Sequence, residues 1–321
     1  MLHRLSRHQS VGGPPARRFP LLPRKKNSDK SDYGHVLVLA GSKGLTGAAI
    51  LTSRAALRSG SGLVTLGIPE SLVPSMERPL VEVMKMGLPE TRQGSLSPAS
   101  YARILDFIKK RKISALALGP GLSQNANTAR LVRRLVRSVR VPTVLDADGL
   151  NSFKGRPEEL LGHAPGLVLT PHKREFERLF SKKWPKKISD RIQLAKKLSK
   201  FYHGVLLVKG HPTLIAGGEK VYVNKTGNPA LATGGTGDVL TGMIASFIGQ
   251  GLGLFEAACW AVYFHGKAGD VLAKKKGPMG LAAGDLIEIL PEVFRKFCPP
   301  LKRRRTQKKR WGSSAGRAAV L

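Results

Sequence analysis

Short apolar runs alternate with amphipathic segments along most of this chain, from about residue 33 to residue 297. The apolar runs with strand character lie at residues 35–40, 63–67, 114–118, 142–146, 167–170 and 204–209. Strands that are apolar along their whole length are typical of a parallel sheet that is buried between helices on both faces. The alternation therefore predicts an α/β fold in three layers, α/β/α, around a mostly parallel central sheet.

The segments between these runs predict helices, and the C-terminal part is mainly helical. Apolar residues recur with helical periodicity at residues 48–58, 101–110, 128–139, 188–201, 239–250, 255–274 and 284–297. Two further apolar runs, at 213–216 and 220–223, flank Gly217 and Gly218. Because paired glycines favour a tight turn, we expect one β-hairpin beside the parallel strands.

Five glycine-rich or polar loops follow the predicted strands. They are residues 41–47, 119–121, 146–148, 170–172 and 209–210. The carboxyl ends of parallel strands lie at one edge of a sheet, and ligands of open α/β sheets bind beyond that edge. The loops therefore predict a single active-site cleft.

The two ends of the chain are strongly basic. The chain has 54 lysine and arginine residues against 21 acidic residues, a formal net charge of +33. Residues 1–28 carry seven positive charges and the residues from 295 onward carry ten, with no acid in either segment. Such runs are usually solvated and bind polyanions weakly. We therefore expect a basic, unordered extension at residues 1–29, one domain at 30–298, and a basic, unordered tail at 299–321.

Cysteine content and hydropathy exclude several classes of protein. Two cysteines, Cys259 and Cys298, are too few for a disulfide framework or a metal site, which favours a cytoplasmic location. No apolar run reaches the roughly 18 residues of a membrane span, so no membrane association is expected. No nucleic-acid-binding motif accompanies the basic charge, so no specific nucleic-acid partner is expected. The arginine-rich N-terminus favours a polar extension, because its prolines break an amphipathic helix, and a transit peptide is the alternative.

A glycine cluster at residues 234–237 is followed directly by Asp238 and an apolar helical run. Glycines allow turns that present backbone N–H groups, and a helix start adds partial positive charge. These features predict an anion hole with one carboxylate at its edge, as a phosphoryl group and a base for a hydroxyl proton require. The alternative is a glycine-rich helix entry in which Asp238 is only the N-terminal cap.

Two glycine loops and two aspartates are further candidates, each with a structural alternative. Residues 41–48 match neither the phosphate-binding P-loop nor the dinucleotide fingerprint, and 119–121 pair two glycines at a strand end. Both loops can admit a ligand or can simply pack closely. Asp146 and Asp148 can contact magnesium or substrate, or can cap a helix and bind loop amides.

A histidine and a lysine are further candidates at the edge of the sheet where the predicted strands end. His172 follows Pro171 directly after a strand, which favours a functional role over a structural one. Lys209 ends its strand at the same edge and can pair with phosphate oxygens, or can be a solvated strand end. His265 and Asp270 lie in a helical stretch, and we expect them to pack and hydrogen-bond beneath the site.

The set of motifs resembles that of the ADP-dependent NAD(P)H-hydrate dehydratases, a branch of the ribokinase-like superfamily. The matching segments are residues 33–42, 46–49, 55–65, 118–122, 145–148, 169–172, 208–210, 226–229, 234–242 and 263–270. They span roughly residues 33–290 in the order of the family. The Gly-Thr-Gly-Asp motif at 235–238 alone occurs in many small-molecule kinases, whereas the full set is specific.

The resemblance implies a ribokinase-like fold and a repair reaction. Hydrated NADH or NADPH (NADHX or NADPHX) is returned to the working cofactor at the expense of ADP, or ATP, with Mg²⁺ as cofactor. Asp238 is implied as the catalytic base, and Ala48, Gly121, His172 and Asp238 as the substrate contacts. The adenine nucleotide is implied to contact Lys209, Gly210, His211, Pro212, Thr213, Gly235, Thr236 and Gly237. No protein residue is implied as a metal ligand.

The chain departs from the family pattern at two places. Lys173-Arg174 stands where the family usually has Pro-Gly, which changes the loop geometry or adds affinity for anions. Many relatives also carry an N-terminal epimerase domain, whereas about thirty residues precede the first predicted strand here. We therefore expect a functional partnership with a separate NAD(P)HX epimerase, and we also expect a homo-oligomer.

Two rival functions use the same features. A kinase of a small hydroxylated metabolite, such as a thiazole, pyrimidine or sugar alcohol, needs the same anion hole and base. The Leu-Gly-Pro-Gly segment at 118–121 and the Thr-Pro-His segment at 170–172 favour the dehydratase instead. A polyanion-binding protein on an inactive scaffold would use the basic ends, but the intact glycine cluster and Asp238 argue against it.

Overall fold

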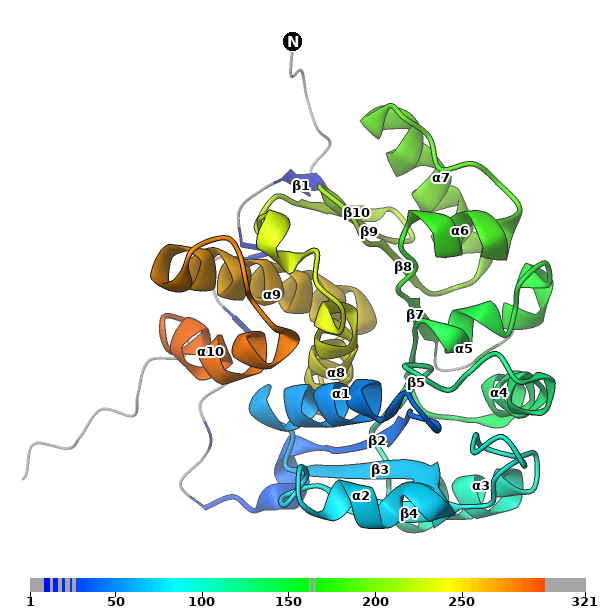
Figure 1. Ribbon diagram of the computed structural model, residues 1–321. Helices are drawn as coiled ribbons and strands as arrows, with labels where there is room; N and C mark the ends of the chain where they lie inside the picture. The colour runs from blue at the N-terminus through cyan, green and yellow to red at the C-terminus, as the bar shows by residue number, and fades with distance from the viewer. Residues whose placement is uncertain are drawn as a thin grey trace, which may run out of the picture.

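The computed structural model describes residues 9–11, 14–16, 19–20, 24, 27–161, 163 and 166–297. The expected tail at 299–321, Cys298 and much of the expected extension at 1–29 lie outside the described residues. In the described part, helices cover both faces of one central sheet (Figure 1). This arrangement confirms the predicted α/β fold with a mostly parallel sheet.

The sheet has ten strands among the described residues. They are β1 (Gln9–Val11), β2 (His35–Leu39), β3 (Leu63–Pro69), β4 (Met84–Leu88), β5 (Ala115–Leu118), β6 (Thr143–Leu145), β7 (Leu167–Leu169), β8 (Val205–Val208), β9 (Thr213–Gly217) and β10 (Lys220–Asn224). Their order across the sheet is β1-β10-β9-β8-β7-β6-β5-β2-β3-β4. Strand β9 runs antiparallel to β8 and β10, which confirms the hairpin, and the other pairs are parallel.

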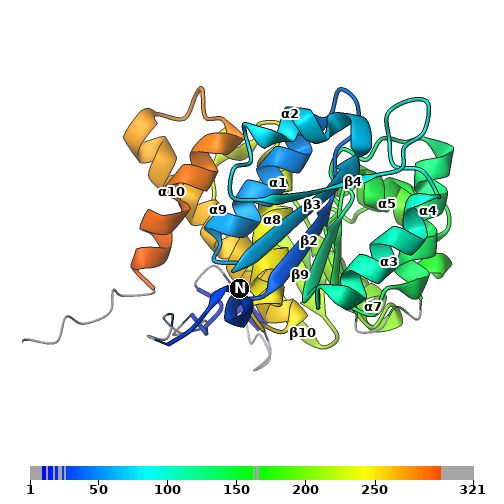
Figure 2. The ribbon, with the colours of Figure 1, turned by 90° about the horizontal axis from the view of Figure 1, so that it is seen from below.

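The helices form two layers, one on each face of the sheet. They are α1 (Thr46–Arg58), α2 (Val73–Glu77), α3 (Ser100–Lys110), α4 (Ala126–Ser138), α5 (Asp148–Asn151), α6 (Lys173–Phe180), α7 (Ile188–Phe201), α8 (Thr236–Gly249), α9 (Leu254–Lys276) and α10 (Ala283–Arg295). Helices α1, α8, α9 and α10 lie on one face, and α3 to α7 lie on the other (Figures 1 and 2). None of the helices in the described part of the chain combines the length and the apolar character that a membrane span needs.

Strand β2 shows why the strand runs are apolar throughout. Val36 and Val38 lie in the hydrophobic core that α1, α8, α9 and α10 cover. Leu37 and Leu39 point to the opposite face and lie in the second core, under α3 to α7. Because successive side chains of a strand point to opposite faces, a strand between two cores needs an apolar residue at every position.

Helices α1 and α8 pack closely where Gly242 meets Thr52. A Cβ atom on Gly242 would lie 2.2 Å from the carbonyl oxygen of Thr52 and 2.9 Å from the Cβ atom of Ala55. No side chain fits at this position, so the glycine permits the close approach of the two helices. The contact fixes the start of α8 relative to the glycine loop that leads into α1.

The sequence did not predict several short elements, among them strand β4 and helices α2 and α6. Strand β4 lies at the edge of the sheet, and its sequence Met-Lys-Met-Gly-Leu lacks the unbroken apolar pattern of the inner strands. Helix α2 has only five residues, and α6 has eight, most of them charged. Short elements bury little apolar surface, so their sequences carry a weak periodic signal.

Some described positions near the N-terminus contact the rest of the fold. Strand β1 pairs in parallel with β10. Phe19 is buried, and its ring lies 5.2 Å from that of Phe247, 5.1 Å from that of Trp260 and 4.9 Å from that of Phe264. An apolar residue in a basic segment therefore anchors the segment to the helical layer of α8 and α9.

Candidate functional site

The carboxyl ends of three neighbouring strands bring the polar candidates together. Strands β6, β7 and β8 are adjacent in the sheet, and Asp146, His172 and Lys209 follow them. A parallel bridge between His172 and Lys209 continues the pairing of β7 and β8 beyond the strand ends. The topology therefore gathers these loops at one edge, as the sequence predicted.

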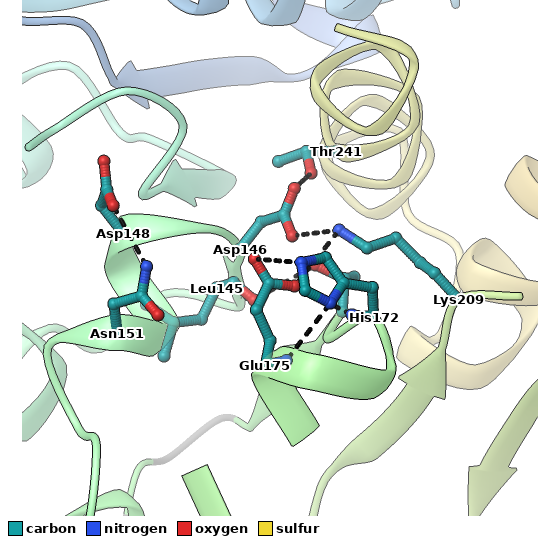
Figure 3. A network of polar contacts seen from close by, with 9 residues as sticks. Leu145, Asp146, Asp148, Asn151, His172, Glu175, Lys209 and Thr241 are labelled. Atoms are coloured by element: carbon teal, nitrogen blue, oxygen red, sulfur yellow. Dashed lines mark hydrogen bonds and ion pairs between the residues drawn. The ribbon is translucent and has the colours of Figure 1, made fainter. Parts of the chain in front are cut away.

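Lys209 is held between two carboxylates (Figure 3). Its Nζ donates a hydrogen bond of 2.7 Å to Oδ1 of Asp146 and lies 3.8 Å from Oε2 of Glu175. The hydroxyl of Thr241, on α8, donates to Oδ2 of Asp146 at 2.7 Å. Burial by itself lowers the pKa of Lys209, but Asp146 and Glu175 outweigh it, so the pKa is raised above its ordinary value. Lys209 is therefore a cation fixed at the sheet edge.

Asp238 lies in the first turn of α8. Gly235, with a φ of 88°, is the N-cap of this helix, and no side chain makes a capping hydrogen bond there. The alternative in which Asp238 is the cap is therefore wrong. Burial and the negative charge of Asp146 raise the pKa of Asp238 to about 7, although Lys209 opposes this rise. A carboxylate that exchanges its proton near neutral pH suits a general base.

His172 and Glu175 form a reciprocal cap at the start of α6. Nδ1 of His172 accepts a hydrogen bond from the backbone N–H of Glu175 at 3.2 Å. Oε2 of Glu175 accepts one from the N–H of His172 at 2.8 Å. Because Nδ1 accepts, the neutral ring carries its proton on Nε2, and the side chain is 47% exposed. Glu175 was not among the predicted site residues, although its spacing of three residues from a helix-starting position is a capping signal.

Ala48 and Gly121 lie against each other at the neighbouring glycine loops. A Cβ atom on Gly121 would lie 3.0 Å from that of Ala48 and 2.8 Å from the carbonyl oxygen of Leu45. A Cβ atom on Gly119 would lie 1.9 Å from the carbonyl oxygen of Asp146. Both glycines have positive φ angles. Close packing therefore requires glycine at both positions, and it brings the loop before α1 next to the loop after β5.

A cavity of about 570 Å³ opens beside Lys209 and the start of α8. Its lining comprises Lys209, Gly210, His211, Thr213, Asn224, Thr226, Gly227, Asn228, Pro229, Leu231, Ala232, Thr236, Gly237, Leu240, Val262, His265 and Gly266. Of the residues that the resemblance implies for the nucleotide, Pro212 and Gly235 are the two that do not line it. The lining also includes Asn224, Leu240 and Val262, for which no ligand contact was predicted.

The residues implied for the hydrate lie outside this cavity. Ala48, Gly121, His172 and Asp238 are not among its lining residues. Asp238 follows Gly237, which lines the cavity, and Nζ of Lys209 is 3.5 Å from the place where a Cβ atom of Gly237 would be. The start of α8 and Lys209 therefore form the boundary between the residues implied for the nucleotide and the residues implied for the hydrate.

His265 and Asp270, on α9, hydrogen-bond to the loops around this cavity. Nε2 of His265 lies 2.9 Å from the carbonyl oxygen of Thr236, so it is the nitrogen that donates. Burial lowers the pKa of His265 to about 4, and the ring is therefore neutral at ordinary pH. The carboxylate of Asp270 accepts hydrogen bonds of 3.3 Å from Gly227 and Asn228. Both residues support the loops that line the cavity.

Asp148 binds nearby amide groups, as the structural alternative for this residue predicts. Its carboxylate accepts hydrogen bonds from the backbone N–H of Ser123 at 2.9 Å and from the side chain of Asn151 at 3.1 Å. Within the described ranges, no group of three or more histidine, cysteine, aspartate or glutamate side chains is arranged to hold a metal ion.

Comparison with known proteins gives a consistent result. The model of the NAD(P)H-hydrate dehydratase family matches residues 36–292. The bifunctional NAD(P)H-hydrate repair enzyme Nnr of Moorella thermoacetica is 44% identical over 86% of this chain and 52% of its own length. The chain thus spans about half the length of the bifunctional relatives that it matches. The ADP-dependent (S)-NAD(P)H-hydrate dehydratase of Neisseria meningitidis is 34% identical, over 84% of this chain and 89% of that protein.

Solved structures agree with these matches. The ADP/ATP-dependent NAD(P)H-hydrate dehydratase of Bacillus subtilis, co-crystallised with ATP/Mg²⁺, superposes with a TM-score of 0.72 and 31% identity, over 86% of this chain and 94% of that one. A ribokinase-like superfamily protein of Enterococcus faecalis has a TM-score of 0.74 at 24% identity, over 87% of this chain and 93% of that one, which shows the shared fold alone.

Proposed function

Because this chain belongs to the NAD(P)H-hydrate dehydratase family, we propose that it converts hydrated NADH or NADPH back to the working cofactor in a reaction that consumes ADP or ATP. One observation carries the proposal. The half-buried carboxylate of Asp238, which has a pKa of about 7, lies at a glycine-rich helix start beside the fixed Lys209 cation and a cavity of nucleotide size. This arrangement suits phosphoryl transfer to a hydroxyl group.

The nucleotide is assigned to the cavity beside Lys209. Leu240 and Val262 provide apolar surface for the base, and Lys209 with the N–H groups of the α8 start suits the phosphates. Pro212 and Gly235 remain part of the proposed nucleotide set as backbone neighbours of the lining residues. The terminal phosphoryl group would then face the boundary at Gly237.

The hydrated dinucleotide is assigned to the other side of that boundary. Ala48 and Gly121 pack closely against each other at the two glycine loops. The half-exposed side chain of His172, whose Nε2 lies 3.5 Å from Oε1 of Glu175, adds a polar group at the sheet edge. Asp238 is the carboxylate of this set, and its pKa is raised to about 7. The hydroxyl of the hydrated ring is therefore expected to lie against Asp238.

The chemistry follows from these positions. Asp238 accepts the proton of the ring hydroxyl while the hydroxyl oxygen attacks the terminal phosphoryl group of the nucleotide. Backbone N–H groups at the start of α8 and the Lys209 cation stabilise the charge on the transferred group. The lone pair of the ring nitrogen then expels phosphate from the carbon that carried the hydroxyl. The next ring carbon, on the side away from the nitrogen, loses a proton to solvent, and this loss restores the double bond.

Magnesium fits this site only as an ion that arrives with the nucleotide. Mg²⁺ usually keeps several waters and binds one or two carboxylates together with substrate phosphates. The described residues form no cage for such an ion. On the phosphates it would neutralise negative charge, and the protein residues would act as described without it.

The test is an assay with purified chain, hydrated NADH, magnesium and either ADP or ATP. Recovery of reduced-nicotinamide absorbance that depends on the nucleotide supports the proposal. Asp238→Asn is the matched control and should give no recovery. Absence of recovery with both nucleotides, from a folded chain that binds them, would refute it. Transfer of phosphate to a small hydroxylated metabolite would instead identify the rival kinase.

The wider setting belongs to the same proposal. It comprises a cytoplasmic location, a homo-oligomer and a separate epimerase that interconverts the two forms of the hydrate. Light scattering of the purified chain measures the oligomeric state. Addition of an epimerase to the assay should raise the recovery from a mixture of both hydrate forms towards completion.

A further inference from the structure

Asp146 connects two elements that carry different parts of the proposed machinery. One carboxylate oxygen accepts from Nζ of Lys209 at the end of β8, and the other accepts from the hydroxyl of Thr241 on α8. Both hydrogen bonds measure 2.7 Å. Figure 3 shows Asp146 between the two donors. Each oxygen thus accepts a hydrogen bond from a different part of the fold.

The backbone of Asp146 is fixed as firmly as its side chain. The residue is 1% exposed, and its N–H donates to the carbonyl of Leu118 at 3.1 Å. Its own carbonyl oxygen fills the space that a side chain on Gly119 would need. Ala147, which follows, has a φ of 49°, in the left-handed region that costs energy for a residue with a Cβ atom. The surrounding contacts therefore hold Asp146 in one orientation.

Thr241 places this anchor directly beneath Asp238. The two residues are three positions apart in α8, so they lie on neighbouring parts of one helix face. The hydrogen bond of Thr241 to Asp146 therefore fixes the rotation of the first helical turn. Lys209, on the same carboxylate, is fixed beside Gly237.

Asp238 is surrounded by charged groups from four other elements. Negative charges come from Asp146 after β6, Asp148 at the start of α5 and Glu175 on α6, and the cation is Lys209 after β8. The nearby His265 on α9 is neutral, because burial lowers its pKa. The electrostatic environment of Asp238 thus depends on where the single cation is held among three carboxylates.

We propose that Asp146 is a positioning residue: it anchors Lys209 and the first turn of α8, and this anchored ion pair sets the protonation state of Asp238. The role of Asp238 as the base rests on the proposed function. The charge relation, by which we mean the effect of the Asp146–Lys209 ion pair on the protonation of Asp238, does not. Asp146 itself touches neither the hydrate nor the nucleotide in this scheme. It acts through Lys209 and Thr241.

The charge relation is tested by NMR titration of isotope-labelled aspartate carboxyl groups in the full chain. The signal of Asp238 is identified by its loss in Asp238→Asn, and in the wild type its midpoint should lie near 7. Lys209→Met removes the cation and should raise the midpoint by about one pH unit, whereas Asp146→Asn removes a negative charge and should lower it by about as much. Asp106→Asn, which breaks an exposed ion pair with Lys110, is the control and should leave it unchanged.

Opposite shifts support the proposal, and equal or absent shifts in the two variants overturn it, whether or not the chain turns over the hydrate. A wild type without turnover that still shows opposite shifts would refute the proposed function alone. In an active enzyme, the acidic limb of the pH–rate profile should move with each midpoint.

A second pair of variants tests the anchor without changing any charge. Thr241→Val removes the donor to Asp146, and Thr241→Ser keeps it. We expect the valine variant to lose about tenfold or more in kcat at unchanged fold, since loss of one hydrogen bond to a charged group misplaces the ion pair, and the serine variant to restore it. Equal kcat values in the valine and serine variants would contradict the anchoring role. This pair also decides the question if Asp146→Asn does not fold.

Discussion

Replacement of Asp238 by asparagine should abolish turnover and at the same time stabilise the fold. Burial and the negative charge of Asp146 raise the pKa of Asp238 from its ordinary 3.8 to about 7. Between these values the unfolded chain has released the proton and the folded chain retains it. The folded state then binds more protons, so the free energy of unfolding falls as the pH rises.

The size of this effect follows from the pKa difference. The pKa of Asp238 is raised by about three units, and each unit corresponds to roughly 1.4 kcal/mol. Above pH 7 the ionised Asp238 therefore destabilises the folded state by about 4 kcal/mol. An amide has similar size and carries no charge, so Asp238→Asn avoids this cost. The same change removes the base, and loss of a general base typically costs about 100- to 10,000-fold in rate.

Urea unfolding of both proteins at about pH 5 and about pH 8 measures the stability difference, and about 3 kcal/mol of it should develop between the two conditions. Asp106→Asn is the matched control, because it removes one exposed negative charge from the same chain. A difference between wild type and Asp238→Asn that is the same at both pH values would refute the electrostatic reasoning. A variant that keeps more than about a tenth of the wild-type turnover would refute the assignment of the base.

Three further changes have distinct expected outcomes. Lys209→Ala should weaken adenine-nucleotide binding more than hydrate binding, and equal losses in calorimetry would count against its place beside the nucleotide. Phe19→Ala should lower the free energy of unfolding by about 3 kcal/mol, because a buried aromatic ring is lost, and an unchanged urea midpoint would contradict its packing. Gly242→Ala should cost about 1–3 kcal/mol, since its Cβ atom meets the carbonyl of Thr52, and thermal unfolding without a lower Tm would show that α1 and α8 separate freely.

The layers of the fold could be predicted because the inner strands lie between two cores. Strands such as β5 and β8 are apolar at every position, a pattern that polar-faced strands do not show. Strand β4 has a single neighbour in the sheet and contains Lys85, so the same rule does not find it. Phe19 was missed because a single apolar residue in a basic segment carries no periodic signal.

The location of the site could be predicted, but its contacts could not. Parallel topology sends the ends of β6, β7 and β8 to one edge, and that follows from the order of elements alone. The bond between Lys209 and Asp146 joins residues 63 positions apart, and the bond between Thr241 and Asp146 spans 95 positions. No local pattern contains such pairs, because they depend on the three-dimensional packing of α8 against the sheet.

The residues that line the cavity could also be predicted only in part. Some of its lining residues, such as Lys209 and Gly237, belong to motifs that sequence alone can identify. Leu240 and Val262 line it from buried helices, where any apolar residue fits both a core position and a ligand contact. Which face of α8 and α9 meets the cavity is decided by the packing, so the sequence cannot distinguish the two roles.

The central claim is that the hydroxyl of the hydrate receives a phosphoryl group, with Asp238 as the base. The most direct measurement uses hydrated NADH whose ring hydroxyl carries the heavy isotope of oxygen, with nucleotide and magnesium present. Phosphoryl transfer followed by expulsion of phosphate predicts that the heavy oxygen appears in inorganic phosphate, one for each NADH restored. Heavy oxygen found in water, with unlabelled phosphate, would contradict the account, because the hydroxyl would then have left without being phosphorylated.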